Sequence, residues 1–177
     1  LGRIKEREAV HRDGDLHGGS HIWVIRRTAD CLAEVLLQRR RADKDSFPGC
    51  LDVSCAGHMT AGEDFLSTAR RELSEELGLS VREEDLIYLH SQQVGGDYVF
   101  HGRPFRNYEI NHVYLLRPDF PLEGLRFQEE EIAGLEWQDI CLIRERLAAG
   151  SKEYCIHEPE LLELYRYCRE TLGMELT

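Results

Sequence analysis

The stretch formed by residues 57–79 has a pattern that few local structures can accommodate. It opens with a loop that contains Gly57 and Gly62, and residues 63–77 then contain neither Pro nor Gly. Apolar residues recur at helical spacing in that segment, and Gly78 follows it as a helix end would require. The apolar positions are Phe65, Leu66, Ala69, Leu73 and Leu77. The pattern therefore predicts a glycine loop that leads into a helix with one buried face.

Three carboxylates share another face of this predicted helix. Glu72, Glu75 and Glu76 have the spacing i, i+3 and i+4, which brings their side chains together. Like charges at this spacing cost a few tenths of a kcal/mol per pair, so the face gains from a counter-charge. Mg²⁺ or Mn²⁺ suits it, because these hard cations prefer oxygen ligands, and Arg71 could orient one of the glutamates. The alternative is that residues 70–76 form an ordinary solvated helix face.

Other segments alternate between predicted strands and helices. Strands are expected at residues 21–26, 34–38, 51–56, 86–90, 94–100, 110–117 and 132–137, and further helices at 142–149 and 158–172. Gly95 and Gly96 suggest a bulge or tight turn, residues 28–31 a turn, and residues 101–106 an irregular loop that could carry specificity. The order predicts an α/β (α+β) fold with a mixed sheet covered by helices on both faces.

Length and composition limit the organisation and the partners. The 177 residues fit a single domain, with residues 1–20 as an N-terminal arm or edge strand and 158–173 as the C-terminal helix. The net charge of -11 argues against a nucleic acid polymer as partner. No apolar run approaches the ~20 residues of a membrane span, so we expect a cytoplasmic protein, and a homodimer is only weakly favoured. Six cysteines without CxxC pairs predict reduced, mostly buried thiols.

The complete spacing of the stretch resembles the signature of Nudix hydrolases. It reads Gly57, five residues, Glu63, seven residues, Arg71-Glu72-Leu73, one residue, Glu75-Glu76, one residue, Gly78-Leu79. The resemblance implies an α/β/α sandwich, with Glu75 and Glu76 as the main metal ligands, Glu72 as ligand or base, and the Gly57 carbonyl as a ligand. It makes Arg71, Glu63 and Gly78 supports of the loop and helix.

The implied reaction is attack of water on phosphorus in a nucleoside diphosphate derivative or another small organic diphosphate. Mg²⁺ or Mn²⁺ would neutralise the phosphate oxygens, and a carboxylate would accept the proton of the water. Family members often take a further ligand or base from outside the signature. Glu131, at the end of residues 129–131, is the candidate here, and a solvated acidic loop is the alternative.

Residues 36–58 are similar to isopentenyl diphosphate isomerase, which shares this fold. The resemblance makes Arg40 and Lys44 contacts of the substrate diphosphate, against the alternative of ordinary surface bases. His17 and His58 match metal-binding positions of the isomerase, and His11 lies one residue from a third. His58 is therefore a candidate for substrate or metal contact, although isolated histidines are more often packed or exposed.

Two departures favour a hydrolase over the isomerase. The isomerase needs a cysteine where this chain has Ala56, and Cys55 lies one residue too early, on the other face of a strand. The isomerase also uses glutamates in a later strand for its protonation chemistry. These positions align here with Ile110 and His112, although the nearby Glu109 makes the register of the alignment ambiguous. A non-catalytic ligand-sensing module is the third possibility.

Aromatic residues could stack on the base of a nucleotide substrate, or could simply pack in the core or in loops. The candidates are Trp23, Tyr98, Phe100, Phe105 and Tyr108.

Overall fold

The computed structural model describes residues 4–28, 33–118 and 125–176. Its strands are β1 (Leu16–Arg27), β2 (Ala33–Arg40), β3 (Leu51–Asp52), β4 (Cys55–His58), β5 (Leu86–Phe100), β6 (Arg103–Leu116) and β7 (Ile132–Asp139). Within these ranges they form one seven-stranded sheet in the order β3-β2-β1-β6-β5, with β4 beside β1 and β7 beside β2. β1 and β6 pair in parallel and the other described pairs are antiparallel, so the sheet is mixed as predicted.

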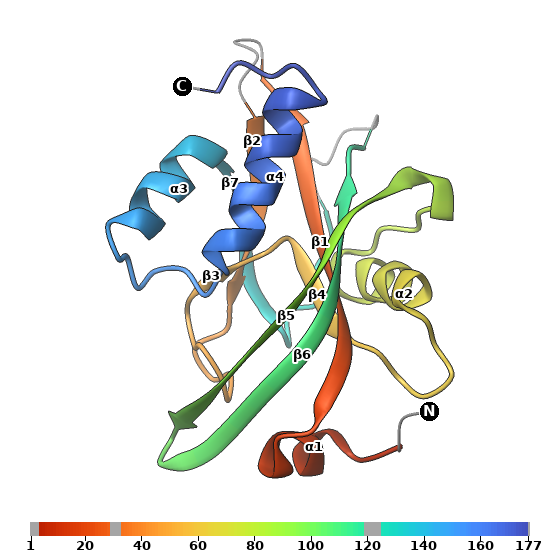
Figure 1. Ribbon diagram of the computed structural model, residues 1–177, viewed down its shortest axis with the longest axis vertical. Coiled ribbons are helices and arrows are strands. Elements are labelled where there is room, and N and C mark those ends of the chain that lie inside the picture. Colours follow the sequence, from red (N-terminus) through yellow and green to blue (C-terminus); the bar gives the residue numbers. More distant parts are fainter. Residues whose placement is uncertain (1–3, 29–32, 119–124, 177) are drawn as a thin grey trace.

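Helices cover both faces of the sheet, which confirms the predicted fold class. The helices are α1 (Arg7–Asp13), α2 (Phe65–Leu77), α3 (Ile140–Ala148) and α4 (Glu158–Glu170), with a 3-10 turn η1 at Glu83–Asp85. Figure 1 shows α2 on one side of the sheet and α3 and α4 on the other. Each side has its own hydrophobic cluster, the first built on Trp23 with α3 and α4, the second on Ile22 with α2. Neighbouring residues of β1 thus serve opposite cores.

The helix α2 is stabilised at both ends by residues next to it in sequence. The Asp64 carboxylate accepts a hydrogen bond from the Ser67 amide at 2.8 Å, and the Ser67 hydroxyl accepts one from the Asp64 amide at 3.0 Å. Gly78 ends the helix at φ +65°, a conformation that glycine adopts without strain. The helix therefore begins two residues later than predicted and ends where predicted.

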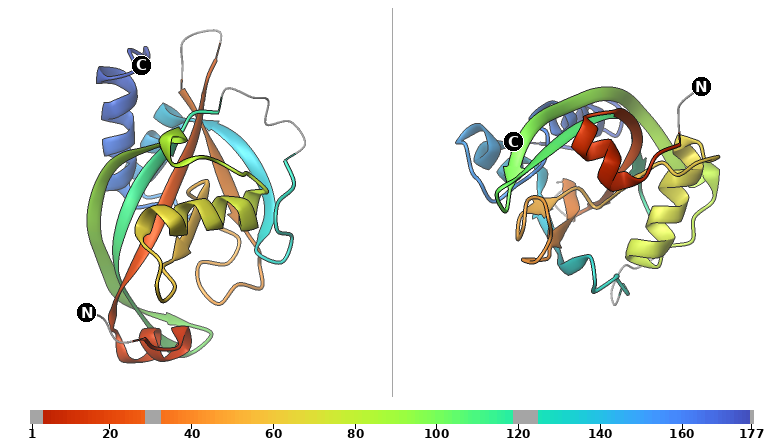
Figure 2. Two further views of the ribbon diagram at one scale, coloured as in Figure 1. Left: turned by 90° about the vertical axis from the view of Figure 1, so that its right-hand side faces the viewer. Right: turned by 90° about the horizontal axis from the view of Figure 1, so that it is seen from below.

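The N-terminal segment differs from the expected arm or edge strand. Residues 7–13 form the helix α1, which Gly14 ends at φ +73°. β1 begins at Leu16 and lies between β6 and β4, inside the sheet. Figure 2 shows α1 beneath the lower ends of β1 and β6. The charged composition of this segment did not reveal the helix, which packs mainly against β6.

The strand predicted at residues 51–56 is two short strands with different partners. β3 pairs with β2, whereas β4 pairs with β1. Ser54 lies between them, where its hydroxyl donates to the Leu36 carbonyl at 2.5 Å and accepts from the Val24 amide at 2.7 Å. These two bonds replace sheet pairing while the chain crosses from one part of the sheet to the other.

The two strands predicted from residue 86 to residue 100 are one, and the expected loop at 101–106 is a hairpin. A Cβ on Gly95 would lie 2.4 Å from Cδ1 of Tyr108, so this glycine permits close packing within a continuous β5. The register shift lies instead between Tyr88 and His90. Only His101 and Gly102 form the turn, with φ of 51° and 72°, typical of a two-residue hairpin.

No helix among the described residues is long and apolar enough to span a membrane. Five cysteines are free thiols, namely Cys50, Cys55, Cys141, Cys155 and Cys168, whereas Cys31 and most of the predicted turn at 28–31 lie outside the described residues.

Candidate active site

Arg71 lies at the centre of the acidic face of α2. Its guanidinium donates to Glu63 at 2.8 and 3.2 Å, to Glu72 at 2.7 Å and to Glu75 at 3.0 Å. A fifth bond, 3.0 Å long, reaches the backbone carbonyl of His58 at the end of β4. Arginine suits this position because its planar fork can donate to several acceptors at once. The single cation thus connects the helix, the loop before it and β4.

The loop between β4 and α2 is fixed by Glu63. The Glu63 carboxylate accepts from the Thr60 amide at 3.1 Å and from the Thr68 hydroxyl at 3.1 Å. Its bond with Arg71 lowers the pKa of Glu63 to about 2, so it stays charged near neutral pH. Glu63 therefore holds the loop and the helix in one arrangement.

Gly57 touches the carboxylate of Glu72 with its backbone. A Cβ built on Gly57 would lie 1.9 Å from Cδ and from Oε1 of Glu72, so no other residue fits here without displacing that glutamate. Glu72 is largely buried, which raises its pKa. Burial likewise raises the pKa of Glu76, one turn further along α2, to about 7. A backbone segment and buried carboxylates therefore share one small space, as the oxygen donors of a divalent cation would.

Glu76 lies apart from the Arg71 contacts. It is 9% exposed, and Gln38 of β2 donates to its Oε2 at 3.2 Å. Burial also raises the pKa of the neighbouring Cys55 thiol, which is fully buried on the α2 side of β4. Ala56, the next residue, belongs to the opposite face, as strand alternation requires.

The predicted phosphate contacts already have acidic partners. Lys44 forms an ion pair with Glu131, so the structure brings together one predicted phosphate contact and the predicted additional ligand. Arg40 donates to Asp52 at 3.1 Å and to the Ser46 carbonyl at 3.0 and 3.2 Å. Both cations thus belong to residues 40–46, and Glu131 contacts the same segment. The ion pair between Lys44 and Glu131 would have to open before either side chain could bind a ligand.

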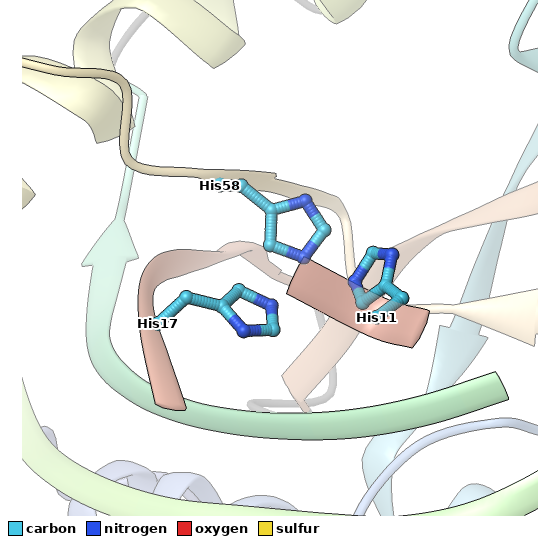
Figure 3. A group of neighbouring side chains, drawn as sticks. All are labelled: His11, His17 and His58. Carbon is cyan, nitrogen blue, oxygen red and sulfur yellow. The ribbon is translucent and has the colours of Figure 1, made fainter. Parts of the chain in front are cut away.

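Three histidines from three elements meet beside β4. His11 of α1, His17 of β1 and His58 of β4 point toward one another, and one nitrogen of each lies within 4.8 Å of the others (Figure 3). Among the described residues, His11 Nε2 and His17 Nε2 are buried and lack a hydrogen-bond partner. Burial lowers the pKa of His11 to about 4, so it is a neutral imidazole near pH 7. The neutral imidazole of His11, with its unpaired nitrogen, is a suitable ligand for a divalent transition metal.

Glu109 of β6 completes this histidine group, and the sequence comparison with the isomerase did not assign it there. Its Oε1 lies 2.9 Å from His58 Nε2 and 3.6 Å from His17 Nε2. Burial disfavours its charge, yet the adjacent histidines hold the pKa of Glu109 below the ordinary range. Asn107 and Asn111 donate to it at 3.0 and 2.9 Å.

The structure places Glu109, and not Ile110 or His112, beside the histidines. His112 points to the opposite face, where its ring stacks on Phe65 of α2 with centroids 3.7 Å apart. Strand alternation places Glu109 and Asn111 together on the face of His58. The register could have been recognised from alternation, since Val113 and Leu115 continue that buried face.

The aromatic candidates separate by position. Trp23 is fully buried in the core, and Tyr108 bonds to Asp97 on the exposed face of the hairpin. Tyr98, Phe100 and Phe105 instead gather on the inner face with a residue not considered before, Phe47. Phe105 also packs on His11 with centroids 4.4 Å apart, so this aromatic group borders the histidines.

Several known proteins are similar to this chain in sequence. "Nudix hydrolase 3" of Arabidopsis thaliana is 40% identical over 141 residues, 77% of this chain and 17% of the plant protein. An uncharacterized Nudix hydrolase of Clostridium acetobutylicum is 33% identical over 135 residues, 76% of this chain and 62% of that protein. The chain thus spans less than two thirds of either relative. An isopentenyl-diphosphate Delta-isomerase of Serratia proteamaculans is 28% identical over 148 residues, 83% of this chain and 75% of the isomerase.

A solved structure supports the fold independently of close sequence similarity. The crystal structure of a NUDIX hydrolase from Alicyclobacillus acidocaldarius superimposes with a TM-score of 0.62 at 17% identity, covering 86% of this chain and 90% of that one. Residues 17–156 match the NUDIX domain family, a range that contains β4, α2 and the carboxylates around Arg71. The chain therefore belongs to the NUDIX domain family.

Proposed function

We propose that the protein hydrolyses a diphosphate linkage in a nucleoside diphosphate derivative or another small organic diphosphate, with Mg²⁺ or Mn²⁺ bound. The contact between Gly57 and Glu72 carries this proposal, because it brings a backbone segment against a buried carboxylate on the acidic face of α2. The relatives named as Nudix hydrolases support the reaction class.

Glu72, Glu75 and Glu76, with the Gly57 carbonyl, would hold the cation. When bound, it neutralises phosphate oxygens and acidifies the attacking water. Arg71 keeps Glu72 and Glu75 in position through its short bonds to both. One of the glutamates accepts the proton of the water, since carboxylates with raised pKa values are suited to that step.

Arg40 and Lys44 would bind the diphosphate of the substrate. Each is held by a carboxylate in the structure, so an incoming phosphate competes with Asp52 for Arg40 and with Glu131 for Lys44. Exchange of one anion for another keeps the charge of each cation balanced. Glu131, once released by Lys44, becomes available as a further ligand or base.

A substrate panel combined with one substitution tests the proposal. Nucleoside diphosphates, nucleotide sugars, dinucleoside polyphosphates and prenyl or thiamine diphosphates are incubated with Mg²⁺ or Mn²⁺, and phosphate release is measured. We expect turnover of at least one class and its loss in Glu76→Gln, whereas Glu83→Gln, on the exposed turn η1, keeps wild-type activity. Similar turnover in Glu76→Gln would contradict the proposed site.

The histidine group favours a second candidate, isopentenyl diphosphate isomerisation. His17 and His58 match metal-binding positions of the isomerase, and Glu109 joins them in the structure. Ala56 stands against it because the residue offers no thiol. Of the two polar residues of β6 on the His58 face, only Glu109 is a carboxylate, whereas Asn111 is an amide. Incubation with isopentenyl diphosphate and Mg²⁺ decides: rapid formation of the dimethylallyl isomer would replace the hydrolase proposal.

A further inference from the structure

Glu160 is a fully buried carboxylate in the first turn of α4, on the side of the sheet opposite α2. Its Oε1 accepts from Trp23 Nε1 at 2.7 Å, and its Oε2 lies 2.9 Å from His21 Nδ1. Gln92 of β5 is a further donor to Oε2. A buried charge needs such partners, and here two strands supply them to one helix. The group holds the imidazole of His21 in a fixed orientation.

The second nitrogen of His21 has no hydrogen-bond partner among the described residues. The side chain retains 15% exposure while Nδ1 bonds to Glu160, so the ring has one engaged and one unengaged nitrogen. A carboxylate bonded to one imidazole nitrogen fixes the orientation of the other, as in catalytic carboxylate and histidine pairs. His21 Nε2 is thus oriented by the fold without a partner of its own.

Charged groups from three other elements act on His21. Burial disfavours its protonation, but Glu160 of α4, with weaker contributions from Glu109 of β6 and Asp52 of β3, raises the pKa of His21 to about 9. The imidazole is therefore a cation near neutral pH, and Nε2 carries a proton that it can donate.

His21 lies in the strand beside β4, on the face of the sheet that also carries Ala56 and His58. It is paired with Ala56 of β4 in the antiparallel register, and the adjacent pair joins Ser20 to Gly57. Directly paired residues have side chains on the same face, with Cβ atoms about 5 Å apart. Ala56 occupies the position of the isomerase cysteine and presents only a methyl group, and the His21 imidazole is its directly paired neighbour across the two strands.

We infer that His21, oriented by Glu160, contacts the diphosphate of the substrate as a hydrogen-bond donor through Nε2. The inference rests on the proposed function and adds a residue outside the Nudix signature to its binding site. A cation at this point complements Arg40 and Lys44, which approach from residues 40–46 and are both shared with carboxylates. The competing explanation is that the pair with Glu160 only fastens α4 to the sheet.

Two substitutions of His21 separate these explanations. His21→Asn keeps a donor at the place of Nδ1 and so keeps the bond to Glu160, whereas His21→Gln keeps a donor near Nε2 and weakens that bond. Calorimetry measures binding of methylenediphosphonate, a diphosphate analogue that cannot be hydrolysed, in the presence of Mg²⁺. We expect His21→Asn to unfold at nearly the wild-type temperature and to lose at least about tenfold in affinity, as for one charged hydrogen bond.

His21→Gln should show the opposite pattern, a lower unfolding temperature with a smaller loss of affinity. The inference would be overturned if His21→Asn bound the analogue as well as wild type and only His21→Gln, the less stable variant, bound it more weakly. A wild-type protein that binds the analogue but hydrolyses no diphosphate would instead overturn the proposed function alone. The two failures are therefore distinguishable.

The pH dependence provides a measurement that a purely structural role would not change. In wild type, affinity for methylenediphosphonate should fall as the pH rises through about 9, where His21 loses its proton. Glu160→Gln removes the main charge that raises this pKa, so the fall should begin at lower pH. The ¹³Cε1 resonance of His21 in the wild-type protein gives a second test, and a titration unaffected by the analogue would contradict the contact.

Discussion

Gly57 is a glycine for a reason different from that of Gly78. Gly78 has φ +65° and ends α2, whereas Gly57 is not among the glycines with positive φ. Its constraint is the Glu72 carboxylate, which lies where a Cβ would be. A backbone and a carboxylate must lie this close when both contact the same ligand. Gly57 is therefore required by the candidate site, whereas Gly78 is required by the end of a helix.

We expect Gly57→Ala to reduce turnover by about 100-fold, because the methyl group displaces Glu72 and a shift of about 1 Å can have that effect on catalysis. The matched control is Gly134→Ala, whose added methyl meets no atom within 4 Å. Steady-state kinetics on the substrate found in the panel, with circular dichroism for folding, measures both. Equal activity in the two variants would show that Glu72 does not need its present position.

Glu76 combines a role in the proposed site with a cost in stability. Burial raises the pKa of Glu76 to about 7 from the ordinary 4.5, so its contribution to stability is complete below pH 4.5 and is lost as the pH rises through 7. The Gln side chain of the variant Glu76→Gln does not ionise. With a chelator present, the unfolding free energy of the variant should therefore exceed that of wild type. The difference should grow from pH 4.5 to 8 and reach about 3 kcal/mol.

Urea unfolding at several pH values measures this difference. Addition of Mg²⁺ should reduce it, because the cation stabilises the charged carboxylate in wild type only. A difference that does not depend on pH would mean that Glu76 titrates normally in the folded protein.

Among the helices and strands, α2 was predictable because its signals are local. Asp64, Ser67 and Gly78 fix its ends through bonds within a few residues, and its apolar spacing identifies the buried face. The spacing of the carboxylates around Arg71 followed from the same helix. The grouping of these carboxylates in the candidate site could therefore be predicted from sequence.

The histidine half depends on contacts between distant segments. α1 brings in His11 only because it packs on β6, and Glu109 faces His58 only in the register that β6 adopts beside β1. The break at Ser54 likewise depends on bonds to Leu36 and Val24, which lie 18 and 30 residues away. Local sequence patterns carry no information about such pairings.

The N-cap of α2 gives a test of stability that leaves the chemistry intact. Asp64→Ala removes the acceptor of the Ser67 amide and should cost about 1 kcal/mol, which lowers the unfolding temperature by roughly 2–4 °C in a chain of this size. Asp64→Asn keeps an acceptor and should remain within a few tenths of a kcal/mol of wild type. Thermal unfolding followed by circular dichroism compares the two, and an equal loss in both would mean that charge, not capping, stabilises this end.

Across the molecule, β4 separates two groups of potential ligands with different chemistry. Gly57 faces the carboxylates of α2, and the adjacent His58 faces His11, His17 and Glu109. Oxygen ligands suit Mg²⁺, whereas imidazoles suit a transition metal such as Zn²⁺. The alternation of one short strand thus presents oxygen ligands on one side and imidazoles on the other.

Each cation should therefore stabilise the protein through its own group of residues. A ligand at 100 times its dissociation constant adds about 2.7 kcal/mol, or roughly 5–10 °C in unfolding temperature for a chain of this size. We expect Glu76→Gln to reduce the shift caused by Mg²⁺ and to retain that caused by Zn²⁺, with His17→Gln giving the reverse. Thermal unfolding of chelator-treated protein, titrated with each metal, measures the four shifts. If both variants lost the response to both metals, the two groups would have to act as one site.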